Sequence, residues 1–156
     1  MFPELVILCG LQGSGKTTFR RGRLPGHVVV SKDLMRNNRR KELRQRELVE
    51  HALAAGESVV VDNTNPARAD RAPLIAIGRE LGAKVVGFYF DVDLAVCMRR
   101  NAARSGRDLV PRVGLLSVAR RLEAPTSEEG FDELWLVRAP EGRFEAEPMG
   151  VAVDPG

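Results

Sequence analysis

The sequence has few cysteines and histidines, the residues that form the disulfides of secreted domains or bind zinc. It contains two cysteines among 156 residues, and Cys9 and Cys97 lie far apart in apolar segments, without the spacing of a disulfide framework or a zinc site. Its two histidines, His27 and His51, also lack metal-ligand spacing. These absences argue against a disulfide-stabilised domain and against a zinc protein.

Long hydrophobic runs are missing as well. No apolar stretch approaches the roughly 20 residues that cross a membrane, and residues 1–4, MFPE, lack the charged and apolar regions of a secretory signal. We therefore expect a cytoplasmic protein without a membrane partner. A chain of 156 residues is about one domain long, which is enough to bury a core.

Charge is unevenly distributed along the chain. Residues 1–123 carry 22 Lys and Arg against 13 Asp and Glu, a balance of +9, whereas residues 124–156 carry 2 against 8, a balance of −6. Arginine accounts for 20 of the 24 basic residues. Its planar side chain matches phosphate well, but a GC-rich genome or heat adaptation produces the same bias. Composition alone therefore does not decide the function.

Short apolar runs alternate with helical patterns. Strands are predicted at 5–9, 28–31, 58–62, 85–90 and 134–137, and helices at 16–21, 34–54, 67–81, 94–104 and 112–123. Strands that are apolar on both faces are typical of a parallel sheet covered by helices, so the predicted fold class is α/β. Pro, Gly and Glu dominate from residue 139 onward. We therefore predict a domain at 1–138 and an irregular tail without chemistry at 139–156.

The segment 8–20, LCGLQGSGKTTFR, carries the clearest motif. It satisfies G-x-x-x-x-G-K-[ST] between a strand pattern and a helix pattern, where glycines let backbone N–H groups surround a phosphate chain. Lys16 would reach the β and γ phosphates, and the Thr17 hydroxyl would ligate Mg²⁺. A plain glycine-rich turn is the alternative. We predict a site for ATP or another NTP formed by Gly10, Gln12, Gly13, Ser14, Gly15, Lys16, Thr17 and Thr18.

Two acids follow predicted strands, at the sheet edge where ligands of α/β proteins bind. Asp62 follows VVV, the pattern of strand then acid that holds magnesium in phosphate-loop proteins. Asp33 follows the run 28–32 and is a helix N-cap ahead of Leu34, a catalytic base, or both. Asn63 in place of Glu after Asp62 disfavours a motor ATPase, and the absence of N-K-x-D disfavours a Ras-class GTPase. Phosphoryl transfer to a hydroxyl remains, with Asp33 as the candidate base.

Arginines gather where phosphoryl transfer needs positive charge. Arg100 and Arg104 lie four positions apart in a predicted helix, beside Gly106 as a hinge. This pattern predicts a lid over the phosphates, and a solvated basic face is the alternative. A second group lies in the first turns of the helix predicted after Asp33, where the helix dipole disfavours cations. Its members are Arg36, Arg39, Arg40 and Lys41. We therefore expect an anionic ligand beside Asp33.

Together these motifs resemble the kinase module of 5′-polynucleotide kinases, phosphate-loop enzymes that phosphorylate 5′-hydroxyl ends of DNA or RNA. The resemblance runs from about residue 5 to residue 137. It rests on GLQGSGKTTF, SKDLMR, VVVDNTNPARADR, RRNAAR and EAPTSEEGFDEL. The DNTNP run and the late P-x-x-x-E-G-F are the specific parts, since phosphate-loop kinases in general do not share them. The resemblance implies a P-loop kinase fold, a parallel sheet flanked by helices with a short helical lid.

The resemblance also implies roles for particular residues. Asp33 matches the general base, and Arg36 matches the arginine that binds the acceptor phosphate. Arg100 and Arg104 match the lid arginines. The strand-end segment beside the acceptor is matched by Asp62, Asn63 and Thr64, and a basic position in the following helix is matched by Arg71. The resemblance therefore implies that these four residues bind substrate. Gln12 departs from the family, because many members have proline there. The chain is also too short to include the phosphatase or ligase domain of full end-healing enzymes.

We therefore predict an Mg²⁺-dependent kinase that transfers the γ-phosphoryl group of ATP or another NTP to a 5′-OH end of DNA or RNA. One alternative is a small-molecule kinase on the same frame. Another is a nucleotide-binding module that is non-catalytic or hydrolyses slowly. The run FDVDLAV, residues 90–96, begins like an aspartyl-phosphatase signature, but acids that end a strand and cap the next helix explain it. The sequence predicts no oligomeric state.

Overall fold

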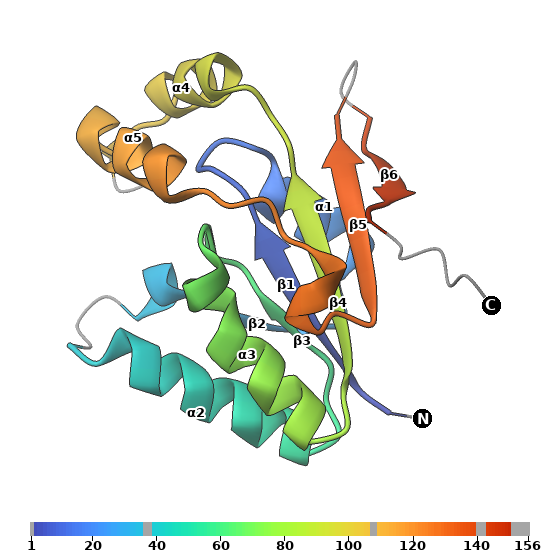
Figure 1. The fold of residues 1–156 in the computed structure, drawn as a ribbon. Helices are drawn as coiled ribbons and strands as arrows, with labels where there is room; N and C mark the ends of the chain where they lie inside the picture. Colours follow the sequence, from blue (N-terminus) through green and yellow to red (C-terminus); the bar gives the residue numbers. More distant parts are fainter. Residues whose placement is uncertain (1, 36–38, 107–108, 140–142, 151–156) are drawn as a thin grey trace.

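A six-stranded sheet lies at the centre of the fold (Figure 1). The computed structural model describes residues 2–35, 39–106, 109–139 and 143–150. The strands are β1 (Glu4–Cys9), β2 (Val28–Val30), β3 (Val59–Val61), β4 (Lys84–Phe90), β5 (Glu133–Arg138) and β6 (Glu145–Pro148). Their order is β2-β3-β1-β4-β5-β6, with β6 antiparallel to β5 and the other pairs parallel. The predicted α/β class is confirmed.

Helices cover both faces of the sheet and its carboxyl edge. The helical elements are α1 (Lys16–Arg23), η1 (Lys32–Leu34), α2 (Lys41–Ala54), α3 (Arg68–Glu80), α4 (Leu94–Ala102), α5 (Arg112–Arg121) and η3 (Ser127–Glu129). Helices α2 and α3 pack on one face and α1 on the other. Figure 1 shows α4 and α5 beyond the carboxyl ends of the strands, as the predicted lid requires. Within the described ranges, each helix is too short or too polar to cross a bilayer.

The central strand β1 supplies both cores. Leu5 and Ile7 pack toward α2 and α3, whereas Val6 and Leu8 pack toward Phe19 of α1. All four β1 side chains are fully buried. Alternate side chains of a strand point to opposite faces, so β1 contributes to the core on each side of the sheet. Burial of each of these side chains stabilises the fold by about 1.5–3 kcal/mol. The two-sided apolar pattern of the sequence has this origin.

Helix α2 begins later than predicted. The helix expected at 34–54 begins at Lys41, and the segment after β2 forms the short η1 instead. Ser31 is the N-cap of η1, and its hydroxyl accepts a hydrogen bond from the Asp33 amide. Arg40 is the N-cap of α2, so Arg39 and Arg40 precede the first turn rather than lying inside it. This arrangement keeps two cations out of the first turn, where the helix dipole opposes them.

The predicted irregular tail is wrong for residues 145–148. This segment forms β6, which pairs with β5 from Arg138↔Glu145 to Trp135↔Pro148. All four β6 side chains are exposed, so no hydrophobic alternation marks the strand in the sequence. Backbone pairing holds it at the sheet edge, where acidic side chains and Pro148 are tolerated. Residues 143–150 therefore belong to the same structural unit as the sheet.

Candidate active site

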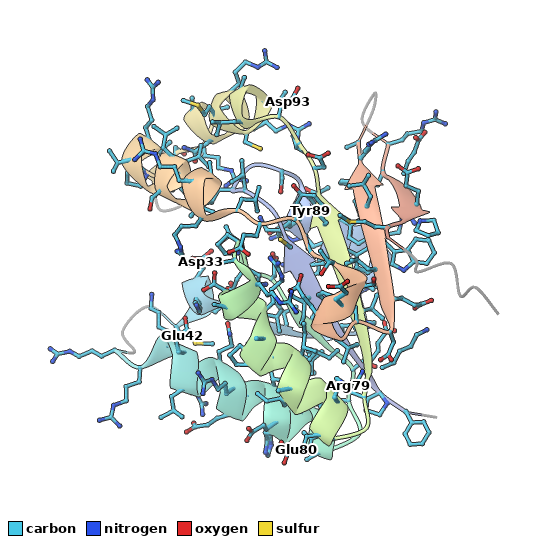
Figure 2. All side chains as sticks on the ribbon, in the orientation of Figure 1. Asp33, Glu42, Arg79, Glu80, Tyr89 and Asp93 are labelled. Carbon is cyan, nitrogen blue, oxygen red and sulfur yellow. The ribbon has the colours of Figure 1, made fainter. Side chains whose placement is uncertain are left out.

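A pocket of about 510 Å³ opens at the carboxyl ends of the strands. The phosphate loop, the segments after β2 and β3, and the lid residues Arg104 and Val110 line it. Asp33 lies at this end of the molecule, whereas Arg79 and Glu80 lie at the opposite end of α3 (Figure 2). Ligands of parallel α/β sheets bind at this edge. The structure therefore brings the predicted loop and the predicted strand-end acids into one cavity.

The phosphate loop is shaped for anions by its glycines. Gly13 and Gly15 have φ of 82° and 99°, values that side-chain-bearing residues rarely adopt. A Cβ atom at Gly13 would lie 2.8 Å from the Cys97 carbonyl oxygen of α4, so only glycine allows this approach of the lid. Lys16 Nζ donates to the Gly10 and Leu11 carbonyl oxygens, each at 2.8 Å. Burial lowers the pKa of Lys16 to about 8. A phosphate chain would offer this amine a charged partner.

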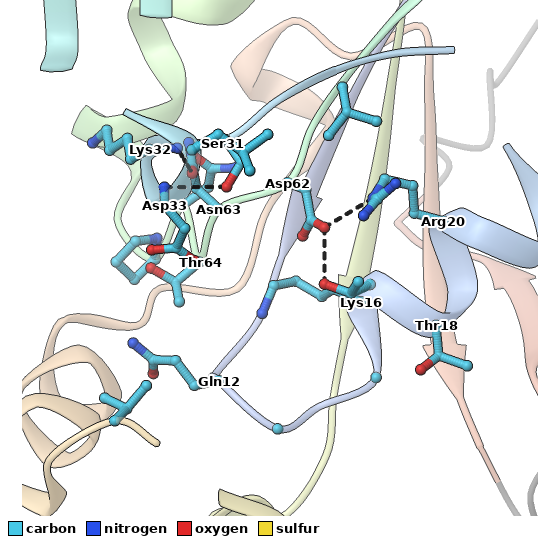
Figure 3. Close-up of a pocket in the computed structure, with 18 of the residues that line it drawn as sticks. Gln12, Lys16, Thr18, Arg20, Ser31, Lys32, Asp33, Asp62, Asn63 and Thr64 are labelled. Carbon is cyan, nitrogen blue, oxygen red and sulfur yellow. Dashed lines mark hydrogen bonds and ion pairs between the residues drawn. The ribbon is translucent and has the colours of Figure 1, made fainter. Parts of the chain in front are cut away.

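Thr17 and Asp62, the two predicted metal ligands, are in contact. The Thr17 hydroxyl donates to Asp62 Oδ2 at 2.9 Å, and Arg20 Nε donates to the same oxygen at 3.0 Å (Figure 3). A hydroxyl beside a carboxylate is the donor set that Mg²⁺ prefers, so these residues fit the ion. Sequence reasoning missed Arg20. Its only signal is its place one helical turn after Lys16, outside the phosphate-loop motif.

The segment after β2 presents Asp33 to the pocket. Lys32 N donates to Asn63 Oδ1 at 2.9 Å, and the Asn63 amide nitrogen donates to Gln45 of α2. Asn63 thus ties the ends of β2, β3 and α2 together. Asp33 is exposed and lines the pocket. Because Ser31 caps η1 and Arg40 is the N-cap of α2, the reading of Asp33 as the helix N-cap is wrong. The role of base stays a prediction.

The segment after β3 is bonded to the phosphate-loop strand. Asn65, with φ of 42°, donates from Nδ2 to the Leu8 carbonyl oxygen at 2.7 Å. Gly10 N donates to the Thr64 carbonyl oxygen at 3.0 Å. Asn tolerates this left-handed conformation better than most residues. The DNTNP run therefore bonds the segment after β3 to β1 and to the start of the phosphate loop. Thr64 of this run lines the pocket.

Arg71 does not lie in the pocket. It is fully buried, and its Nε and Nη2 donate to the two Glu129 carboxylate oxygens at 2.8 and 3.1 Å. Its Nη1 donates to the Asn65 and Pro66 carbonyl oxygens at 2.9 and 3.0 Å. This position is incompatible with the predicted substrate contact. The segments that contain the two most specific motifs, VVVDNTNPARADR and EAPTSEEGFDEL, meet in this ion pair, which supports the pocket wall.

Arg71→Met is expected to lower the free energy of unfolding by about 3–5 kcal/mol, because it leaves the Glu129 carboxylate buried without its partner. Urea denaturation measures this change. The double variant Arg71→Met/Glu129→Met removes both charges and should recover part of the loss. A single variant as stable as the wild type would contradict the assignment of this pair as the support of the wall.

The lid contacts the phosphate loop directly. Arg100 Nη1 donates to the Gly13 carbonyl oxygen at 3.2 Å. Helix α4 ends at Ala102, so Arg104 follows the helix instead of sharing its face with Arg100 as predicted, but it still lines the pocket. The buried Asn101 side chain exchanges two hydrogen bonds with the Val110 backbone, at 2.6 and 2.9 Å, which closes the loop between α4 and α5. Arg36, the predicted acceptor-phosphate ligand, lies outside the described residues.

The hairpin of β5 and β6 also reaches the phosphate loop, which the sequence did not indicate. The Phe144 ring lies 3.2 Å from the position that a Cβ atom would take at Gly15. It packs edge-on against Phe19, with ring centroids 5.4 Å apart, and Arg23 donates to its carbonyl oxygen at 3.2 Å. Phe144 is a lone aromatic in a polar tail, so no pattern marks it.

A phosphate loop at the start of α1, with a strand-end aspartate beside it in a parallel sheet, defines a P-loop nucleotide-binding protein. The sequence profile of a family described as an AAA domain matches residues 5–125. The chain belongs to this family. The predicted P-loop fold is thereby confirmed.

Two curated relatives are kinases. The bifunctional polynucleotide phosphatase/kinase of Schizosaccharomyces pombe is 29% identical over 133 residues, which cover 82% of this chain and 32% of that protein. The L-seryl-tRNA(Sec) kinase of Methanococcus maripaludis is 24% identical over 144 residues, which cover 82% of this chain and 56% of that protein. The chain thus spans about a third of the length of the first relative and about half of the length of the second. The predicted resemblance to polynucleotide kinases is confirmed, and both relatives indicate a phosphotransferase.

One solved structure illustrates the likeness of fold. Kti12 of Chaetomium thermophilum, in complex with ADP-AlF3, has a TM-score of 0.71 and 18% identity, covering 88% of this chain and 91% of that chain. At this identity the likeness concerns the fold alone.

Proposed function

We propose that the protein is a kinase that transfers the γ-phosphoryl group of ATP or another NTP to a 5′-hydroxyl end of DNA or RNA. One observation carries the proposal: Asp33 is an exposed carboxylate that caps no helix and faces the same cavity as the phosphate loop. A carboxylate without a structural role, next to a phosphate site, is suited to take a proton from an acceptor hydroxyl.

The transfer would proceed by direct attack. The hydroxyl oxygen bonds to the γ-phosphorus while its proton moves to a carboxylate oxygen of Asp33. The bond from the γ-phosphorus to the β,γ-bridging oxygen breaks, and the nucleoside diphosphate leaves with that oxygen. Lys16 neutralises the β and γ phosphates, and the arginines of the lid neutralise the transferred group. Water is kept out when the lid lies over the pocket.

Mg²⁺ belongs to the proposal as the partner of the nucleotide. Thr17 and Asp62 would hold it, since their oxygens lie 2.9 Å apart at the end of the phosphate loop. When bound, the ion neutralises charge on the β and γ phosphates. Arg20 contacts the same carboxylate oxygen and keeps Asp62 oriented toward Thr17.

A nucleic-acid acceptor is supported by charge. Residues 94–121 carry seven arginines against one acidic residue, Asp108. Arg104 and Arg121 of this segment line the pocket. Lys32 lies next to Asp33 on the other side of the pocket, and Arg39 and Arg40 directly precede α2. A polyanion between these two walls would meet positive charge on both sides. The similarity to a polynucleotide phosphatase/kinase favours the same acceptor class.

The test is transfer of labelled γ-phosphate to matched acceptors. A 5′-OH oligonucleotide and a nucleoside 3′-phosphate should give far higher kcat/KM than the bare nucleoside, because the phosphate 3′ to the hydroxyl is bound by cations. Raising the salt concentration should increase the acceptor KM. Arg36→Ala, at the position that the resemblance assigns to this phosphate, should remove much of the preference.

Two outcomes would overturn the proposal. Equal kcat/KM for all three acceptors, or a neutral sugar that outperforms them, would leave a small-molecule kinase. Nucleotide binding without transfer to any acceptor would leave a binding module.

A further inference from the structure

Gln12 carries a buried polar atom that the protein leaves unsatisfied. Its Oε1 has no hydrogen-bond partner among the described residues, although water does not reach it. The residue lines the pocket. Figure 3 shows its side chain leaving the phosphate loop on the side of Thr64 and Asp33, away from Lys16. A buried acceptor without a donor costs about 1–3 kcal/mol, and such a cost inside a site indicates a ligand group that completes it.

The missing partner must be a hydrogen-bond donor. The phosphate oxygens of a bound nucleotide are acceptors, so the donor nucleotide cannot satisfy Oε1 through its phosphates. The acceptor hydroxyl that is phosphorylated has one proton, and the proposed chemistry gives that proton to Asp33. The donors that remain are sugar hydroxyls and base amines. A second hydroxyl on the acceptor fits best, because Gln12 leaves the loop on the side of Asp33, where the acceptor would lie. On a nucleic-acid end this group is the ribose 2′-hydroxyl, which DNA lacks.

We propose that the Gln12 side chain selects a ribose end, with Oε1 accepting a hydrogen bond from the 2′-hydroxyl of the terminal nucleotide while the 5′-hydroxyl faces Asp33. This inference rests on the proposed function and narrows its acceptor to RNA. Sites built to bind a hydroxyl reject analogues that lack it, because the buried partner is then left unpaired.

The experiment compares two oligonucleotides of one sequence. Both are DNA, and one has a single ribonucleotide at its 5′-OH end. The wild type should phosphorylate the ribose end with about tenfold higher kcat/KM. In Gln12→Met, which keeps the length of the side chain without its oxygen, the ratio of the two kcat/KM values should fall to near one. The same variant should melt at a higher temperature, because the unsatisfied oxygen is gone.

Gln45→Met is the matched control. The Gln45 side chain is buried, and its amide oxygen accepts a hydrogen bond from the Asn63 amide nitrogen, whereas Oε1 of Gln12 has no such donor. Its replacement should lower the melting temperature and leave the preference for ribose intact. This contrast separates a polar group kept for a ligand from one kept for stability.

The possible failures are distinguishable. Transfer to neither oligonucleotide refutes the proposed function itself. Equal kcat/KM for the two ends in the wild type, or a preference that survives in Gln12→Met, refutes the role of Gln12 alone. A preference that follows the terminal base instead of its sugar would assign Oε1 to a base amine and would also refute it.

Discussion

Lys16→Ala is expected to reduce phosphoryl transfer by about 10³-fold or more with every acceptor. The amine is the charge that the phosphate loop places at the β and γ phosphates. The fold should survive, because burial lowers the pKa of Lys16 from its usual value to about 8, so that keeping this amine charged at pH 7 costs stability in the folded state. The melting temperature should therefore hold or rise. Steady-state transfer assays and thermal melting measure the two effects.

Lys84→Ala is the matched control for this experiment. Lys84 begins β4, at the sheet end opposite the pocket, and its side chain is half exposed beside Glu133. It should change neither transfer nor the nucleotide affinity. Transfer at the wild-type rate in Lys16→Ala would overturn the assignment of residues 10–18 as the nucleotide site.

Asp33→Asn should reduce transfer by about 10²-fold or more while nucleotide affinity and melting temperature change little. An amide has nearly the shape of the carboxylate but cannot take the proton of the acceptor. Stability should hold because the Asp33 side chain is exposed and Ser31, not Asp33, caps η1. The reaction rate and the nucleotide affinity are measured separately, by transfer assays and by calorimetric titration.

Glu80→Gln makes the same chemical change at an exposed position at the far end of α3 (Figure 2). It should leave transfer unaltered. If Asp33→Asn keeps full activity, another group takes the proton, and the observation that carries the proposed function is lost.

The parts of the site that could be predicted are those marked by a short motif or by the end of a strand. The phosphate loop needs glycines, a lysine and a threonine at fixed spacing, so one short motif contains all of its chemistry. Asp33 and Asp62 could be placed because parallel strands end at a common edge, which makes every strand-end acid a candidate. The helix boundaries were predicted less well. Helix α2 begins only after Arg39 and Arg40, at Lys41, and not at residue 34 as the hydrophobic pattern predicted.

The parts that could not be predicted depend on contacts between distant residues. Arg71 was predicted to bind substrate because it matches a basic position of the resembled family, but its partner Glu129 lies 58 positions away. Arg20 contacts Asp62 from a helix turn that no motif covers. The Gln12 position was recognised as a departure, yet its unpaired oxygen could only be seen in three dimensions. Local patterns identified the chemical groups, and the fold decided which of them face the pocket.

The contact of Phe144 with the phosphate loop has a consequence for folding during synthesis. Arg23 and Phe144, which hold the hairpin against α1, are 121 positions apart. The phosphate loop leaves the ribosome well before β6, and folding proceeds from the N-terminal end as the chain emerges. Gly15 therefore acquires its contact with the Phe144 ring only after residue 144 has emerged. A nucleotide that binds the folded state stabilises it by mass action, and it meets the fully packed loop only once Phe144 is in place.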